Sequence, residues 1–285
     1  MPIIFDGRAF ATEKILNLNK EVAKLKNVGI HPKLASILVG DDPAGRLYVS
    51  LKKKRAESIG MEMDIYFLKE KENIETILAL IDSLNIDPTV YGIMVQLPLP
   101  SNFSKEDKEM IISLIDKEKD VDGLREDSLF LHPTSSAVID VINESKKTID
   151  YNSTCADMSH SQGVCHGTNC VVCVVGATGM VGTPLVKELK KEGYEVIKCN
   201  HDTQDLKEKT LRADILISAT GIPNLISSDM IKKGATVIDV GSPKGDVDSE
   251  VSNVAAFMTP VPGGIGPVTI SCLLENLVKA SQGIV

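Results

Sequence analysis

The sequence of 285 residues predicts an α/β protein, in which largely parallel sheets carry helices on both faces. Short apolar runs alternate along the chain with longer segments whose apolar residues recur at helical spacing. One apolar run leads directly into a glycine-rich turn that opens a helix, which is the arrangement of a Rossmann-like domain. The length is comfortable for two compact cores. We therefore expect two α/β domains, the second of them Rossmann-like.

The first part of the chain opens with a helix expected over residues 9–26, where Ile15, Val22 and Leu25 share the helical spacing. A short apolar run at 34–39 predicts a strand, and the turn residues after it end that strand. The same alternation continues through the first part of the chain. It predicts helices over 44–58, 74–84 and 104–115, and strands over 61–68 and 91–95.

Residues 143–169 interrupt this rhythm. They are rich in Ser, Thr, Asn, Asp and Gly and show no periodic apolar pattern, so we expect a linker between domains. After it the alternation restarts. It predicts strands over 171–175, 195–199, 214–218 and 236–240, and helices over 180–192, 204–211, 228–233 and 267–281.

Composition excludes several classes of partner. The formal net charge of -8, the absence of Trp and an aromatic content of 4% argue against nucleic-acid binding. The one basic run, Lys52–Arg55, fits either a solvated helix face or a functional one. No apolar stretch approaches the roughly 20 residues that span a bilayer, and the first residues do not resemble a signal peptide. We expect a cytoplasmic protein without a membrane partner.

Cysteine and histidine crowd into residues 155–173. Cys170 and Cys173 have the spacing of zinc ligands, but the valines around them predict a buried strand on which the two side chains diverge. The pattern therefore favours small buried cysteines and no metal site. The remaining residues of this cluster are Cys155, His160, Cys165 and His166.

The glycine-rich turn follows the predicted strand at 171–175. Gly176, Gly179 and Gly182 let the backbone turn tightly, and the helix that follows presents free N–H groups to a pyrophosphate. The alternative is a simple tight turn between strand and helix. Asp202 lies 26 positions after Gly176, where an acidic residue holds the ribose 2′-hydroxyl of NAD. His201, if charged, meets a 2′-phosphate instead; otherwise it is a surface histidine.

Four further segments appear in a fixed order: residues 39–54, Gly92–Pro100, Lys119–Gly123 and Thr259–Thr269. Together they resemble the signatures of the methylenetetrahydrofolate dehydrogenase/cyclohydrolase family over nearly the whole chain. The resemblance implies two α/β domains flanking a cleft. Residues 1–142 plus 267–285 would form the folate-binding, catalytic domain, and residues 143–266 the NAD(P)-binding Rossmann domain.

The resemblance also implies what the protein does and where. It implies oxidation of 5,10-methylenetetrahydrofolate with NAD(P)+, hydrolysis of the methenyl product to 10-formyltetrahydrofolate, and a homodimer that serves one-carbon metabolism and purine biosynthesis. Tyr48, Lys52, Gln96 and Asp122 would be catalytic. The folate would also border on Leu97, Pro98, Gly264 and Pro267, and the dinucleotide on Gly176, Ala177, Thr178, Gly179, Val181, Gly182, His201, Asp202, Ala219, Thr220 and Gly221.

Elementary chemistry agrees with these roles. Tyr48 and Lys52 are four residues apart and share one helix face. Lys52 can exchange a proton if burial lowers its pKa, and Asp122 offers two acceptors to an amino-pyrimidine edge. Gln96 follows a strand, at the end where open α/β sheets bind ligands.

Three departures from the family pattern leave alternatives open. Ala177 and Thr178 stand where the family has Arg-Ser, and Asp202 adds a negative charge, so that NADP, favoured by the family, and NAD both remain candidates. The segment His132–Ala137 stands where the family has Pro-Cys-Thr-Pro-x-Gly. Another two-domain dehydrogenase, and a folate- or nucleotide-binding paralogue that has lost one or both activities, are the competing interpretations.

Overall fold

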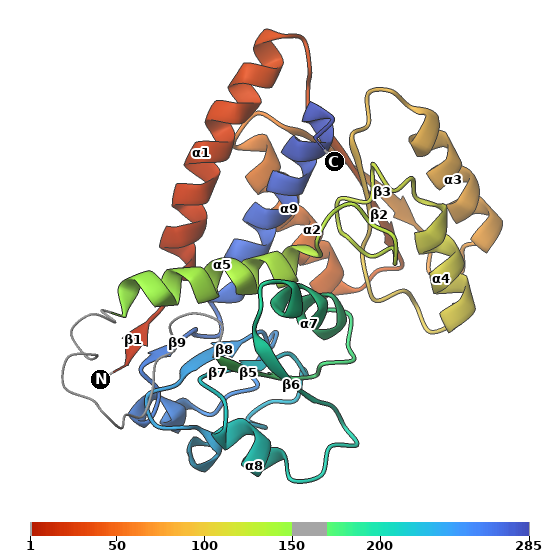
Figure 1. Cartoon of the computed structure of the whole chain (residues 1–285). Helices are drawn as coiled ribbons and strands as arrows, with labels where there is room; N and C mark the ends of the chain where they lie inside the picture. Colours follow the sequence, from red (N-terminus) through yellow and green to blue (C-terminus); the bar gives the residue numbers. More distant parts are fainter. Residues whose placement is uncertain (1, 150–169, 285) are drawn as a thin grey trace. The chain divides into compact units, whose positions relative to one another are not determined.

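The computed structural model describes residues 2–149 and 170–284 (Figure 1). The chain divides into two compact units and crosses from one to the other after Ala11, Pro133 and Thr269. We call them the three-stranded unit and the six-stranded unit after their sheets. Most of the crowded cysteine and histidine cluster, from Cys155 to His166, lies outside the described residues.

The three-stranded unit is built on a parallel sheet with strand order β3-β2-β4. Its strands are β2 (Lys33–Val39), β3 (Glu62–Leu68) and β4 (Gly92–Val95). Its helices are α2 (Pro43–Glu57), α3 (Ile74–Ile86) and α4 (Lys105–Leu114), with the larger parts of α1 (Gly7–Asn27) and α9 (Ile265–Gln282).

Two apolar clusters cover the two faces of this sheet. Leu34 of β2 packs with residues of α1, α2 and α9, whereas its neighbour Ala35 packs with residues of α3 and α4. Successive residues of a strand point to opposite faces, so one apolar strand serves both clusters. Helices α1 and α9 run side by side in this unit (Figure 1), where Lys14 Nζ lies 2.9 Å from Glu275 Oε2. The expected parallel sheet with helices on both faces is confirmed.

The six-stranded unit has a parallel sheet with strand order β1-β9-β8-β7-β5-β6. Its strands are β1 (Ile3–Ile4), β5 (Val171–Val175), β6 (Glu195–Cys199), β7 (Ile215–Ser218), β8 (Thr236–Asp239) and β9 (Phe257–Met258). Its helices are α5 (Pro133–Thr148), α7 (Gly182–Lys191), α8 (Leu206–Leu211) and the 3₁₀ turns η2 (Ser228–Met230) and η3 (Ser249–Asn253).

Strand β5 occupies the position at which the strand order reverses, because β6 lies on one side of it and β7 on the other. Helices α5 and α7 lie along one side of the sheet and α8 along the other (Figure 1). Ser135 Oγ of α5 donates a hydrogen bond of 3.0 Å to the carbonyl of Val181. The carboxyl ends of strands next to such a reversal are where open α/β sheets bind ligands.

The structure differs from the sequence expectation at α5, η2, β1 and β9. Helix α5 is not among the expected helices, and its last residues, 143–148, fall in the expected linker; the helix forms because Val138, Val141 and Ile142 give it a buried face. The helix expected over 228–233 is only the short 3₁₀ turn η2. The two-residue strands β1 and β9 were not expected, since such short runs carry no periodicity.

The boundaries of the units also differ from those expected. The expected division kept residues 1–142 and 267–285 together and separated them from 143–266. In the structure, residues up to Ala11 join the six-stranded unit, because Ile3 pairs with Phe257 in the sheet and Phe5 contacts the Phe257 ring. Residues 134–142 join it as well, through α5. The last crossing falls after Thr269, inside α9.

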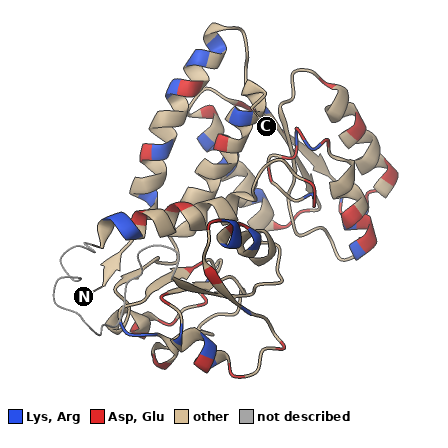
Figure 2. Cartoon of the chain, in the orientation of Figure 1, with Lys and Arg blue, Asp and Glu red and all other residues tan. Residues whose placement is uncertain are grey.

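Charges of both signs are interspersed over the described surface. Figure 2 shows Lys and Arg alternating with Asp and Glu along α1, which carries Glu13, Lys14, Lys20, Glu21 and Lys24. Among the described helices, none combines the length and the apolar character needed to cross a membrane.

Candidate active site and dinucleotide turn

Helix α2 carries the central lysine of the candidate site. The Asp42 carboxylate caps the helix by accepting a 2.7 Å hydrogen bond from Gly45 N–H, and Pro43 occupies the first turn, where its missing N–H is not needed. Tyr48 and Lys52 then fall one turn apart on the same face. Tyr48 is 40% exposed, and Lys52 is half-buried.

Lys52 reaches the end of strand β4. Its Nζ donates a hydrogen bond of 3.1 Å to Gln96 Oε1 and lies 3.8 Å from Met94 Sδ. Burial lowers the pKa of Lys52 because the ammonium form loses hydration, and the nearby Asp122 carboxylate opposes that shift. The site therefore holds an amine that gives up its proton more readily than an exposed lysine.

Gln96 is fixed at both ends. Its backbone N–H donates to the carbonyl of Ile37 at 2.8 Å, which continues the sheet by one residue beyond β4. Its Nε2 donates to the carbonyl of Leu97 at 2.9 Å. Since the amide nitrogen is engaged there, the amide oxygen faces Lys52. The next peptide bond, Leu97–Pro98, is cis, and Pro98 is exposed.

Asp122 lies in the loop between α4 and α5. Polar contacts hold this loop in place. Asp120 is buried, and its carboxylate accepts hydrogen bonds from Leu124 N–H at 3.3 Å and Arg125 N–H at 2.9 Å. Burial nevertheless raises the pKa of Asp120. On the other side, Asn276 Nδ2 donates to the carbonyls of Val121 at 2.9 Å and Leu131 at 3.1 Å. The residues flanking Asp122 are therefore held by the loop itself and by α9.

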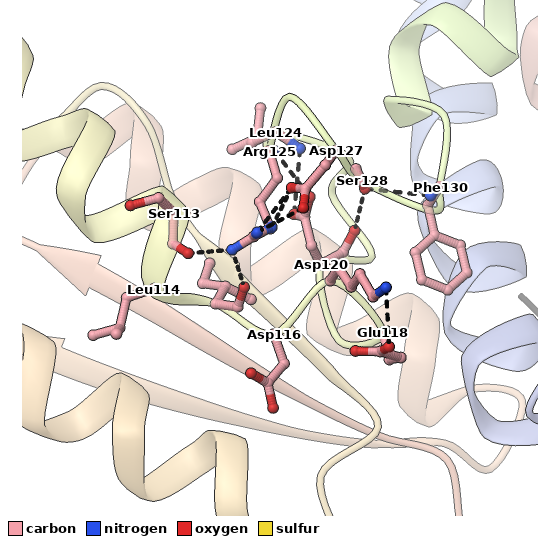
Figure 3. A network of polar contacts seen from close by, with 12 residues as sticks. Ser113, Leu114, Asp116, Glu118, Asp120, Leu124, Arg125, Asp127, Ser128 and Phe130 are labelled. Carbon is pink, nitrogen blue, oxygen red and sulfur yellow. Dashed lines mark hydrogen bonds and ion pairs between the residues drawn. The ribbon is translucent and has the colours of Figure 1, made fainter.

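Arg125 anchors the same loop to the end of α4, as Figure 3 shows. Its Nη1 donates to the carbonyl of Ile115 at 2.7 Å and to that of Ser113. Its Nε and Nη2 donate to the two carboxylate oxygens of Asp127, at 2.8 Å and 3.0 Å. This hydrogen-bonded pair raises the pKa of Arg125 and lowers that of Asp127. A guanidinium that satisfies two helix-end carbonyls fixes the loop in one geometry.

The sequence-predicted folate residues thus fall into two sets. Tyr48, Lys52, Gln96 and Asp122 belong to the three-stranded unit, together with Leu97 and Pro98. Gly264 and Pro267 belong to the six-stranded unit. Gly264 is buried just before α9, where its N–H donates to the carbonyl of Pro260 at 2.8 Å.

His132 is a residue that the sequence indicated only as a departure from the family pattern. It is 7% exposed, and its backbone nitrogen lies 2.7 Å from where a Cβ on Gly123 would stand. Burial lowers its pKa, the Asp122 carboxylate acts in the opposite direction, and the charge of Lys52 lowers it further. A buried, neutral imidazole therefore lies in the electrostatic neighbourhood of Asp122 and Lys52.

The glycine-rich turn leaves β5 as predicted. Gly176 has φ +88°, and a Cβ there would lie 2.3 Å from the carbonyl oxygen of Ala219. A Cβ on Gly182 would lie 2.2 Å from the carbonyl oxygen of Gly176, so the start of α7 packs directly on the turn. Only glycine fits either position. The N–H groups of Gly176 and Ala177 both donate to the carbonyl of Cys199 at 2.9 Å.

The start of α7 lies directly after the glycine-rich turn. Val181 occupies the position before the helix, and no side chain caps the helix there. Within the first helical turn Thr183 N–H donates to the carbonyl of Gly179 at 3.0 Å and Leu185 N–H to that of Val181 at 3.2 Å, and Pro184 has no N–H. The positive end of the helix dipole faces the turn that Thr178 and Gly179 form. Both residues are exposed, whereas Ala177 is buried. A close backbone cradle next to an uncapped helix start fits the pyrophosphate of a dinucleotide.

The loop after β6 carries the two residues expected near the ribose. His201 Nε2 lies 3.1 Å from Asp202 Oδ1, and the side chains are 85% and 77% exposed. Asp202 N–H donates to Asn200 Oδ1 at 3.1 Å, which orders the turn. Both side chains are thus accessible beyond the end of β6. The loop after β7, which holds Ala219, Thr220 and Gly221, reaches Gly176 as described above.

Two buried cysteines lie beneath this turn. Cys173 Sγ and Cys199 Sγ are 3.7 Å apart on the neighbouring strands β5 and β6. Their hydrogen bond lowers the pKa of Cys199 to about 7 and raises that of Cys173. Cys170 is also buried. Across residues 2–149 and 170–284, no three His, Cys, Asp or Glu side chains come together as a metal site.

These features define a two-unit α/β protein that combines a Rossmann-type dinucleotide turn with a lysine–glutamine pair on a second parallel sheet. Comparison with known families and structures identifies the family to which the chain belongs. The family described as tetrahydrofolate dehydrogenase/cyclohydrolase matches in two parts, its catalytic domain over residues 5–122 and its NAD(P)-binding domain over residues 152–284. The chain belongs to the tetrahydrofolate dehydrogenase/cyclohydrolase family.

Individual relatives match over the full length. The bifunctional protein FolD of Exiguobacterium sibiricum is 39% identical, over 99% of this chain and 100% of its own. The structure of the bifunctional methylenetetrahydrofolate dehydrogenase/cyclohydrolase from Campylobacter jejuni has a TM-score of 0.88 at 35% identity, covering 100% of both chains. The Trypanosoma brucei enzyme, solved with NADP cofactor and inhibitor, has a TM-score of 0.86 at 31% identity, covering 99% of this chain and 98% of that one.

Proposed function

We propose that this protein is a bifunctional enzyme of one-carbon metabolism. It oxidises 5,10-methylenetetrahydrofolate to 5,10-methenyltetrahydrofolate with NAD(P)+ and hydrolyses the product to 10-formyltetrahydrofolate. The observation that carries the proposal is the contact of Lys52 Nζ with Gln96 Oε1 at 3.1 Å, in a chain that matches both domains of the family. A dehydrogenase for a small hydroxy acid has no need for this amine together with Tyr48 and Asp122.

The two units divide the work in this proposal. The folate binds on the three-stranded unit, where Tyr48 packs its ring against the substrate and Asp122 accepts hydrogen bonds from the pterin. Leu97, Pro98, Gly264 and Pro267 border the folate. The dinucleotide binds on the six-stranded unit, at the turn and loops described above.

The oxidation needs geometry more than acid–base chemistry. The nitrogen lone pairs of methylenetetrahydrofolate expel a hydride from the one-carbon bridge, so the chain's task is to hold the folate in one orientation. When bound, the dinucleotide supplies the hydride acceptor. The anchored loop around Asp122 and the fixed amide of Gln96 provide the rigid surface that such orientation requires.

The hydrolysis uses Lys52 as general acid and base. The neutral amine accepts a proton from water as the oxygen bonds to the methenyl carbon. It returns that proton to the folate nitrogen as the carbon–nitrogen bond breaks, and the hydroxyl of the adduct releases its own proton to solvent as the formyl C=O forms. The lowered pKa of Lys52 makes the neutral amine accessible. Gln96 accepts a hydrogen bond from Nζ and so orients the amine without adding a charge that would trap its proton.

NADP is the proposed cofactor, with NAD as the second candidate. Gly176, Gly179, Val181 and Gly182 form the cradle and helix start that fit the pyrophosphate. The remaining expected contacts are Ala177, Thr178, His201, Asp202, Ala219, Thr220 and Gly221. The 2′-phosphate of NADP would meet His201, and Asp202 beside it works against that phosphate.

A direct assay tests the proposal. The purified protein is mixed with methylenetetrahydrofolate and either NADP+ or NAD+, and formation and decay of the methenyl absorbance are followed together with reduced dinucleotide. We expect the methenyl species to form and then decay. Formation without decay would mean that only the dehydrogenase is retained. No turnover with dinucleotide binding intact would support the binding paralogue and overturn the proposal.

The cellular setting and assembly are part of the same proposal. We infer a cytoplasmic homodimer formed through the six-stranded unit, whose product serves purine biosynthesis, because the family resemblance implies each of these. Light scattering on the purified protein tests the assembly directly. A single species at the mass of one chain, 30.8 kDa, over a range of concentrations would contradict the dimer.

A further inference from the structure

Asp246 is a buried carboxylate at the carboxyl edge of the six-stranded sheet that none of the steps above uses. It is 0% exposed. Its Oδ2 accepts three hydrogen bonds: from Ser218 Oγ at 2.9 Å, from Thr220 N–H at 2.7 Å and from Thr220 Oγ1 at 2.9 Å. All three donors come from the end of β7 and the loop that follows it. One carboxylate oxygen therefore binds both Ser218 and Thr220, the residues around the point where the chain leaves β7.

Asp246 is itself held by the neighbouring strand. Its N–H donates to Asp239 Oδ1 at 3.0 Å, and its carbonyl accepts a hydrogen bond from Ile226 N–H at 3.0 Å. The same Asp239 carboxylate accepts from Gly241 N–H at 2.8 Å and Val247 N–H at 3.0 Å. The backbone of Asp246 is thus held by the Asp239 side chain at the end of β8 and by the N–H of Ile226, while its own side chain holds the loop after β7.

The loop that Asp246 holds is one wall of the dinucleotide turn. A Cβ on Gly176 would lie 2.3 Å from the carbonyl oxygen of Ala219 and 3.4 Å from Thr220 Cγ2. Thr220 Oγ1 also accepts a hydrogen bond from Ile222 N–H at 3.1 Å, so one side chain sets the path of the loop through Gly221. A shift of Thr220 would therefore open or close the space beside the turn.

Burial of the Asp246 carboxylate opposes folding unless hydrogen bonds compensate for the lost hydration. A buried carboxylate loses its hydration, and its second oxygen, Oδ1, is buried without a hydrogen-bond partner in the described structure. An apolar side chain would avoid that loss, but it would leave the Thr220 N–H and two hydroxyl groups without an acceptor. The chain thus retains a costly group at the point where the loop meets the turn.

We propose that Asp246 is a positioning residue for dinucleotide binding, which holds the Ser218–Thr220 corner against Gly176. The inference rests on the proposed function, because it assumes that the turn binds NAD(P). It assigns to Asp246 an indirect role: the carboxylate does not touch the dinucleotide, but it fixes the loop that does.

The test measures the dissociation constant of NADP+ by calorimetry for Asp246→Ala and for Asp246→Asn. We expect Asp246→Ala to raise the constant about tenfold or more, since three hydrogen bonds to the loop are lost. The amide oxygen of Asp246→Asn can still accept from Thr220 N–H, so this variant should recover part of the affinity. Hydrolysis of methenyltetrahydrofolate, which needs no dinucleotide, should stay within about twofold of wild type for both variants.

A control variant separates positioning from general stability. Asp214 lies at the opposite edge of the same sheet, where it accepts from Val171 N–H at 3.0 Å and from Lys232 Nζ at 2.6 Å. Asp214→Asn should lower the melting temperature without changing the NADP+ constant. If Asp246→Ala lowers the melting temperature and leaves that constant unchanged, Asp246 is only structural and the inference is wrong.

Two further outcomes remain decisive. If Asp246→Ala does not fold, Ser218→Ala replaces it in the test, because this variant removes one donor to the same oxygen. It should raise the dissociation constant of NADP+ about threefold. An unchanged dissociation constant would overturn the inference. If the wild-type protein does not bind NADP+ or NAD+ at all, the proposed function fails first, which is distinguishable from a failure of Asp246 alone.

Discussion

The Nζ atom of Lys52 and the Oε1 atom of Gln96 lie 3.1 Å apart, although 44 residues separate them in the chain. The contact follows from the fold, because α2 packs on the face of the sheet to which Met94 of β4 points. Gln96 is the first residue after that strand. Burial lowers the pKa of Lys52, and the uncharged acceptor does not add a charge that would raise it again. A lysine with a lowered pKa is suited to proton transfer near neutral pH.

Changing the acceptor should move the pH dependence. Gln96→Glu places a carboxylate beside Lys52, stabilises the ammonium form and raises the pKa of Lys52, which burial otherwise lowers. The active species is the neutral amine, which is lost as the pH falls below that pKa. We therefore expect the acidic limb of the hydrolysis rate to move to higher pH, and the rate at neutral pH to fall.

The pH–rate profile of methenyltetrahydrofolate hydrolysis measures this shift. Gln204→Glu is the matched control, because Gln204 is exposed on the six-stranded unit and the substitution changes the net charge equally. An acidic limb that stays in place in Gln96→Glu would show that Lys52 does not control it.

The glycine turn should tolerate a methyl group at one position and not at another. Gly176→Ala forces an alanine to φ +88° and drives its Cβ to 2.3 Å from a carbonyl oxygen. It should lower the free energy of unfolding of the six-stranded unit by more than about 2 kcal/mol and abolish NADP+ binding. Gly179→Ala meets nothing closer than 3.3 Å and should unfold near the wild-type temperature. Equal melting temperatures for the two variants would contradict the described turn.

The stability of the loop around Asp122 should depend more on the hydrogen bonds from Arg125 to backbone carbonyls than on the ion pair between Arg125 and Asp127. Arg125→Met removes the donors to the carbonyls of Ser113 and Ile115 and should destabilise the three-stranded unit by about 2 kcal/mol. The KM for the folate should rise, while the dissociation constant of NADP+ stays unchanged. Asp127→Ala breaks only the contact to an exposed carboxylate and should have a smaller effect on both quantities. A larger effect of Asp127→Ala would reverse this assignment.

The cofactor preference should respond to Asp202. Asp202→Asn removes the negative charge beside His201 and should raise the ratio of kcat/KM for NADP+ over NAD+ by about fivefold. Asp205→Asn is the control, because Asp205 is exposed nearby in the chain and its φ of 59° suits asparagine equally well. An unchanged ratio in Asp202→Asn would place the 2′-phosphate away from this side chain.

Much of the fold was predictable because its signals are local. The strand at 171–175 and the glycines after it follow from apolar runs and backbone sterics, and the structure has both. The end of α5 was not predictable in the same way. Its polar composition suggests a linker, and its helical state depends on the preceding turn, where Val141 and Ile142 are buried, and on the buried Ser145.

The site residues also differ in whether local sequence or tertiary packing determines their contacts. Tyr48 and Lys52 share a helix face by sequence spacing alone, but the contact of Lys52 with Gln96 depends on how α2 packs on the sheet. Asp246 carried no sequence signal at all, because its importance comes from three donors on β7 and the loop after it. The membership of residues 2–11 in the six-stranded unit likewise depends on long-range contacts, the pairing of β1 with β9 and the packing of Phe5 on Phe257.

The central claim is that Lys52 performs the hydrolysis, and one comparison tests it most directly. Lys52→Met and Lys54→Met, the latter an exposed lysine on the same helix, are each supplied with methylenetetrahydrofolate and NADP+ while the methenyl absorbance is followed. In Lys52→Met we expect the methenyl species to accumulate and its hydrolysis to be slower by at least about 100-fold, with Lys54→Met behaving as wild type. Hydrolysis within a few-fold of wild type in Lys52→Met would contradict the account.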